Sequence, residues 1–176
     1  MRLPSLPPRR PALPLERGER LLAWAAIAPA EGEAVDDGPV PSPQSAIGGT
    51  RVALYLPHRL PWEQIASADW DADSGLLRVT EVGTFGEVRP VHLRRLTGAD
   101  RLLQLVRERV TASIAVHRQV AVRDGLSVRI IARRPPTGAD EPTWFVEYDA
   151  ALDPDDPAVA AIVDDALARA RADLEV

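Results

Sequence analysis

The 176-residue chain contains no Cys, no Lys and no Asn, so all 21 of its basic residues are Arg. The lack of Cys excludes disulfides, thiolate metal sites and a cysteine nucleophile. The lack of Lys excludes Schiff-base chemistry and the lysine of a phosphate-binding P-loop. Lys and Asn have AT-rich codons, so both absences indicate a high-GC bacterial genome rather than a function.

The beginning of the chain lacks the pattern of a secretion signal. Residues 1–20 contain five Arg, but no long apolar segment follows them. The apolar stretch at residues 21–30 is much shorter than the ~20 residues that cross a bilayer. We therefore expect a cytoplasmic protein without membrane insertion.

The net charge of −5 is unevenly distributed along the chain. Residues 135–176 contain two Arg and eleven acidic residues, whereas residues 58–134 contain thirteen Arg and nine acidic residues. Nucleic-acid-binding proteins concentrate basic charge on one face. This distribution instead favours two faces of one fold that attract each other, and argues against a nucleic-acid partner.

Proline and short alternating segments define the first half of the chain. Residues 1–15 contain five Pro and predict an extended, disordered tail. Residues 29–49, rich in Gly and Pro, predict a loop. Strands are predicted at residues 19–28, 50–56, 60–69, 76–82 and 87–93. Short strands with tight turns between them are typical of an antiparallel sandwich or barrel.

A helix is predicted next, at residues 97–113, with Thr97 as its N-cap and apolar residues repeating every four positions. The apolar period changes to two near Ile114, where we expect the helix to give way to a strand. Asp124-Gly125 predicts a hairpin turn between this strand and the next.

The end of the chain predicts two further strands and a helix. Residues 126–133 and 143–148 have the alternation and composition of strands. Asp156 as N-cap and Pro157 at the first helical position predict the start of an amphipathic helix that extends to about Leu174.

Three segments of the first half together resemble a known domain family. Residues 19–24 (ERLLAW), 50–56 (TRVALYL) and 60–65 (LPWEQI) follow one another in the order and spacing of bacterial pleckstrin-homology-like (PH-like) domains. The strands near residues 68–82 and the following helix continue the pattern, so the resemblance covers about residues 16–115.

The resemblance implies an α+β fold, in which an antiparallel PH-like half-barrel is closed by a capping helix. Residues 116–176 would extend it by three strands and a C-terminal helix, packed on the same core. Members of the family mostly bind lipid headgroups, peptides or copies of themselves. The loop that binds lipid in relatives would be residues 29–49, which contain four acidic residues and no basic one. This argues against a phosphoinositide ligand.

We therefore expect a non-enzymatic cytoplasmic binding or scaffold module that recognises a protein partner or associates with itself. Two alternatives stay open. One is a binder of RNA or another anionic ligand that uses the Arg-rich middle segment. The other is a small hydrolase with an unrecognised site. The sequence contains no catalytic motif, and we expect no cofactor.

Asp69, Asp71 and Asp73 are the candidate metal ligands. Their alternate spacing resembles the start of a calcium-binding loop. Gly75, however, comes one position too late, and Thr80 stands where the loop needs a bidentate Glu. The same residues also suit an ordinary hairpin turn.

The three His residues show no metal-binding spacing. His58, His92 and His117 are far apart in the sequence and form no H-x-x-x-H pair. They could meet a common metal or substrate only through the tertiary fold, and the alternation around His117 predicts an exposed side chain.

Aromatic and basic residues supply the candidate partner-binding surface. Trp62 and Trp70 are eight residues apart, which places both on one face of an uninterrupted strand. They could anchor a partner or pack in the core. The candidate arginines are Arg94, Arg95, Arg101 and Arg107. They could bind an anionic partner, although we expect them to pair with acidic residues between positions 153 and 165.

Overall fold

The larger of two antiparallel sheets is built mainly from the first half of the chain, in the order β4-β3-β2-β1-β7-β6-β5. The computed structural model describes residues 10–28, 45–56, 58–83, 87–138 and 141–174. The strands of this sheet are β1 (Ala23–Ile27), β2 (Ala46–Gly49), β3 (Ala53–Leu56), β4 (His58–Pro61), β5 (Ile65–Asp71), β6 (Leu76–Glu81) and β7 (Val91–Thr97). Helix α1 (Asp100–Ser113) follows β7.

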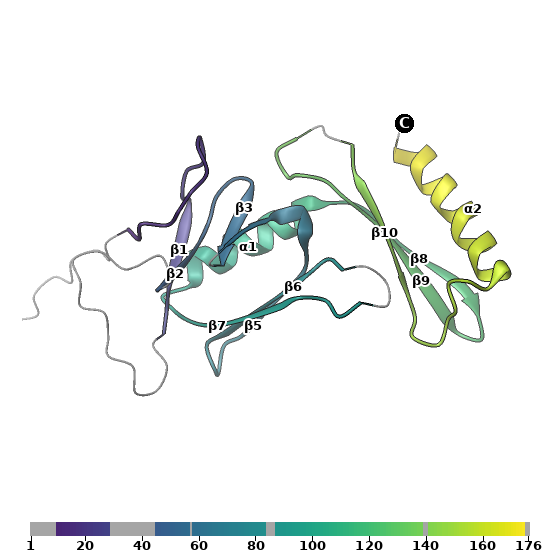
Figure 1. The fold of residues 1–176 in the computed structure, drawn as a ribbon, viewed down its shortest axis with the longest axis horizontal. Helices are drawn as coiled ribbons and strands as arrows, with labels where there is room; N and C mark the ends of the chain where they lie inside the picture. Colours follow the sequence, from purple (N-terminus) through teal and green to yellow (C-terminus); the bar gives the residue numbers. More distant parts are fainter. Residues whose placement is uncertain (1–9, 29–44, 57, 84–86, 139–140, 175–176) are drawn as a thin grey trace, which may run out of the picture.

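The smaller sheet has the order β10-β9-β8. Its strands are β8 (Ile114–Arg123), β9 (Leu126–Arg133) and β10 (Thr143–Tyr148), and helix α2 (Pro157–Leu174) completes the fold. Helix α2 lies on the side of this sheet that faces away from the larger sheet (Figure 1). The expected α+β class is therefore confirmed, with antiparallel sheets and two helices. Neither helix in the described part of the chain is both long and apolar enough to cross a membrane.

The core of the larger sheet centres on Trp62, whose side chain is fully buried. The Trp62 indole N–H donates to the Thr50 carbonyl at 3.1 Å, which satisfies its only polar atom. Helix α1 packs against Trp62 with Leu102 and Leu105 in the same buried cluster. A Cβ added at Gly49 would lie 2.6 Å from Leu105 Cδ2 and 3.2 Å from the Trp62 ring, so both side chains approach β2 closely at this glycine.

The second half of the chain has a buried cluster of its own. Val128 of β9 packs with Leu152, and with Val159 and Val163 of α2. The described buried apolar side chains thus form two clusters, one on each sheet. Helix α2 covers the apolar face of the smaller sheet and leaves its other face toward the larger sheet. That residues 116–176 pack on the core of the first half stays a prediction.

Several predicted element boundaries are wrong at the start of the chain. Strand β2 lies within residues 29–49, which were predicted to be loop, and residues 29–44 are outside the described part. Thr97 does not cap α1, because it pairs with Ala26 as the last residue of β7. Gly98, with φ of 61°, turns the chain so that the helix begins at Asp100.

Trp62 and Trp70 do not share a face as predicted. A short 3₁₀-helix (Trp62–Gln64) and a bulge between Ile65 and Ser67 interrupt the strand and break the period of two. Trp62 is buried, whereas the Trp70 side chain is 37% exposed.

The predictions for the second half are confirmed more closely. Strands β9 and β10 have the predicted bounds, and β8 begins at Ile114. Asp124 and Gly125 both have positive φ, 48° and 78°, as a tight hairpin turn requires. Asp156 caps α2, because its Oδ1 accepts the Ala158 N–H at 2.9 Å.

The predicted disordered tail is only partly covered by the structure. Residues 1–9 lie outside the described residues. Within residues 10–15, Pro11 is buried, and the Leu13 side chain lies beside Gly48 of β2. This part of the segment therefore contacts the larger sheet.

We predict that Trp62→Ala lowers the free energy of unfolding by about 3–5 kcal/mol, because it removes the largest side chain of the core. Trp70→Ala, at a partly exposed position, is the matched control and should cost clearly less. Urea denaturation followed by circular dichroism measures both values. Equal losses of unfolding free energy in the two variants would contradict the central role of Trp62. If Trp62→Ala does not fold, Trp62→Phe is a milder substitution at the same position.

Candidate functional site

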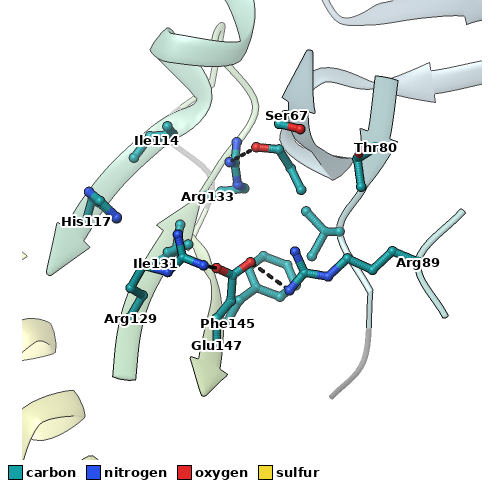
Figure 2. A pocket seen from close by; sticks show the side chains of 12 residues that line it. Ser67, Thr80, Arg89, Ile114, His117, Arg129, Ile131, Arg133, Phe145 and Glu147 are labelled. Atoms are coloured by element: carbon teal, nitrogen blue, oxygen red, sulfur yellow. Dashed lines mark hydrogen bonds and ion pairs between the residues drawn. The ribbon is translucent and has the colours of Figure 1, made fainter. Parts of the chain in front are cut away.

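A cleft of about 370 Å³ lies between the two sheets (Figure 2). The larger sheet contributes residues of β5, β6 and the segment before β7, including Ser67, Thr80 and Arg89. The smaller sheet contributes most of the other side chains, and these are Ile114, His117, Arg129, Ile131, Arg133, Phe145 and Glu147. The volume is within the range typical of small-molecule sites.

Strand alternation explains why these residues face the cleft. Residues 129, 131 and 133 of β9 point to the opposite side from Val128, which packs against α2. The antiparallel register then places Glu147 opposite Arg129, and Phe145 and His117 on either side of Ile131. The cleft is therefore lined by the face of the smaller sheet that α2 leaves uncovered.

Arg133 is the most deeply buried charged residue of the cleft, with 4% of its surface exposed. Its Nη1 donates to Ser113 Oγ at 3.0 Å, and its Nη2 donates to the Ala66 carbonyl at 2.9 Å. Burial lowers the pKa of the Arg133 guanidinium, and the negative charge of Glu147 partly offsets this effect. Both hydrogen-bond partners are neutral, so the buried positive charge has no carboxylate in direct contact among the described residues.

Glu147 forms a second link across the cleft. Its Oε1 lies 2.7 Å from Arg89 Nη2, and its Oε2 lies 2.9 Å from Arg129 Nη2 (Figure 2). The Glu147 carboxylate thus binds two guanidinium groups, one from β9 and one from the segment before β7. Together with Arg133, the described lining has three arginines and one acidic residue, so positive charge is in excess.

The chemistry of the cleft favours binding of an anion with an apolar portion. Guanidinium groups form charge-assisted, often bidentate hydrogen bonds with carboxylates and phosphates. Ile114, Ile131 and Phe145 provide an apolar wall beside them. His117 is the one histidine among the described lining residues. The hydroxyl of Ser67, another lining residue, donates to Asp69 at 3.1 Å.

The three predicted metal ligands do not form a ligand cluster in the described structure. Asp71 instead closes the hairpin between β5 and β6. Its carboxylate accepts the Asp73 N–H at 3.0 Å and the Ser74 hydroxyl at 2.6 Å. These hydrogen bonds lower the pKa of Asp71, with the Ser74 hydroxyl as the largest cause. The segment is therefore the turn that was the alternative interpretation.

The predicted partner-binding residues lie outside the lining of this cleft. Full burial makes Trp62 inaccessible to a partner, whereas Trp70 is partly exposed. The predicted arginines are Arg94, Arg95, Arg101 and Arg107. All four are exposed or partly exposed, and none forms an ion pair with another described residue. A role in partner binding stays a prediction for these residues and for Trp70.

The expected pairing of these arginines with the acidic tail is wrong. Arg123 pairs with Asp156 at 2.8 Å, and Arg118 pairs with Asp173 at 2.6 Å. Both arginines belong to β8. Helix α2 packs on the smaller sheet, so Asp156 at its N-terminus and Asp173 near its end reach this strand.

The sequence interpretation did not single out Arg129 and Arg133. Their position on a strand whose alternate residues are apolar was a usable signal, because it places both on the face opposite the core. The strand pattern did not indicate that this face would lie against the larger sheet.

No protein-family model matches the chain, and neither a curated protein nor a solved structure matches it significantly. The PH-like identity of residues 16–115 therefore stays a prediction. The geometry of the cleft is the basis for any functional proposal.

We predict that Arg133→Lys lowers the free energy of unfolding by about 1–3 kcal/mol. A single ammonium cannot reproduce the guanidinium fork that reaches both Ser113 and Ala66, and one buried acceptor loses its donor. Arg134→Lys, at an exposed neighbouring position, should have little effect. Chemical denaturation measures both, and equal stability of the two variants would refute this role of Arg133.

Proposed function

We propose that the protein is a non-enzymatic binding module for a small organic anion, held in the cleft between its two sheets. This proposal follows the anionic-ligand alternative, but it assigns binding to Arg89, Arg129 and Arg133 of the cleft rather than to the predicted arginines, which lie outside it. The observation that carries it is the buried guanidinium of Arg133, which lines the cleft and has only neutral hydrogen-bond partners.

Electrostatics supports the proposal. Removing a guanidinium from water costs free energy that its neutral partners only partly recover. An anion about 4 Å away would gain roughly 4 kcal/mol of attraction at the effective dielectric constant typical of protein sites. The described lining has three arginines and one carboxylate, so a ligand group with one or two negative charges, such as a carboxylate or a phosphate, matches the excess of positive charge.

The shape and lining of the cleft support a ligand with an apolar body. Phe145 and Ile131 lie beside the guanidinium groups, so a carboxylate or phosphate group could meet the arginines while its apolar portion contacts these side chains. Binding modules are also what the PH-like resemblance implies.

Binding is favoured over hydrolysis for this cleft. The hydrolase alternative requires histidine and carboxylate side chains arranged for proton transfer. Here the carboxylate of Glu147 is held by Arg89 and Arg129, and His117 lies toward the exposed surface. Recognition of a protein partner, self-association and a cytoplasmic location stay predictions.

We predict that benzoate and phenyl phosphate bind in the cleft, whereas the neutral analogue benzamide does not. The charged group supplies the attraction to the guanidinium groups, so affinity should fall as sodium chloride is raised. Amide chemical shifts measured by NMR during titration should change for residues of β9 and β10. Equal binding of benzamide, or no binding of either anion, would contradict the proposal.

We also predict opposite effects for two substitutions in the cleft. Glu147→Gln should strengthen benzoate binding severalfold, because it removes the carboxylate that competes for Arg89 and Arg129. Arg129→Gln should weaken binding, because it removes one guanidinium. Titration calorimetry measures both, with Arg134→Gln as a control that should leave the affinity unchanged. Changes of the same sign in Glu147→Gln and Arg129→Gln would refute the proposed charge pattern.

A further inference from the structure

A second cluster of titratable groups lies on the larger sheet and consists of His58, Glu81 and His92. One potential ligand atom from each residue lies within 4.8 Å of the others. His92 Nε2 lies 2.6 Å from Glu81 Oε1, and His58 Nε2 lies 3.7 Å from the same oxygen. The two imidazole rings meet edge to face, with 5.1 Å between their centres.

The fold brings these residues together from three strands. His92 of β7 pairs with Val79 of β6, and Glu81 lies two residues further along β6 on the same face. His58 begins β4, which is the opposite edge strand from β5 in the order of the sheet. Only curvature of the sheet can place β4 beside β6 and β7, so the sequence spacing could not indicate this cluster.

The chemistry of the cluster is that of a zinc ligand set. Two imidazole nitrogens and one carboxylate oxygen are the three protein ligands found in many zinc sites that keep a fourth position open. Tetrahedral bonds of about 2.0–2.2 Å place ligand atoms roughly 3.3–3.5 Å apart. The 3.7 Å between His58 Nε2 and Glu81 Oε1 is close to this separation. The 2.6 Å between His92 Nε2 and Glu81 Oε1 would need to lengthen by less than about 1 Å.

The surrounding charge favours a cation. Glu81 lines an adjacent cleft together with Glu63, Glu87 and Glu147, and Arg89 is the only described basic residue there. Glu63 Oε2 is buried and has no hydrogen-bond partner within the described residues. Four carboxylates against one guanidinium give this cleft an excess of negative charge, which raises the local concentration of cations.

We propose that His58, Glu81 and His92 bind one Zn²⁺ ion, with a fourth position open to water or to another ligand. The absence of Cys from the chain means that histidine and carboxylate ligands alone would hold the ion. The proposal is separate from the anion cleft, because these three side chains are not among its lining residues.

Zinc chloride titration of the protein without an affinity tag tests the proposal, by calorimetry and by native mass spectrometry. We expect one zinc ion per chain, and no comparable binding of Mg²⁺, which prefers oxygen ligands. His58→Ala, Glu81→Gln and His92→Ala each remove a proposed ligand. Loss of a residue that only supports a ligand weakens metal binding roughly 10–100-fold, so each variant should weaken zinc binding by at least this factor.

His117→Ala is the matched control, because His117 is exposed and lies outside the cluster. It should bind zinc like the unmodified protein, and so should Arg129→Gln, which separates this proposal from the anion cleft. If His92→Ala does not fold, the NMR chemical shifts of the imidazole nitrogens in the unmodified protein test the proposal instead. Zinc must then move the signals of His58 and His92 and leave those of His117 unchanged. No binding at micromolar zinc, or loss of binding in His117→Ala, would overturn the proposal.

Discussion

The Arg133 guanidinium joins the two halves of the molecule, and the position of the cleft depends on it. Its hydrogen bonds reach Ser113 at the end of α1 and Ala66 in β5, 20 and 67 residues away along the chain. The Arg89–Glu147 ion pair crosses the same gap. The described apolar side chains form a separate cluster in each half, so the contacts identified across the cleft are mainly polar.

This arrangement explains why the cleft suits an anion. If apolar side chains joined the two sheets, no charged group would line the cleft between them. Because arginines join them instead, guanidinium groups line a cleft that a ligand can enter. Glu147 compensates part of this charge, and Arg133 remains without a direct counter-ion among the described residues. The same contacts that hold the sheets together therefore create the proposed binding site.

Local sequence signals predicted the second half of the fold well and the sites poorly. The Asp124-Gly125 turn and the Asp156 cap depend on neighbouring residues, so the sequence was sufficient to place them. The 3₁₀-helix at Trp62 broke the strand period and separated Trp62 from Trp70, which periodicity could not indicate. The cleft and the His58–Glu81–His92 cluster depend on packing and sheet curvature between distant strands, which have no local signal.

The proposed function depends on binding of the anion by the arginines that line the cleft, with the buried Arg133 among them, rather than by the arginines outside it. The most direct measurement is the NMR response of the arginine guanidinium nitrogens to phenyl phosphate. We expect the signals of Arg129 and Arg133 to shift with a common binding curve. Shifts confined to the arginines outside the cleft, namely Arg94, Arg95, Arg101 and Arg107, would contradict it.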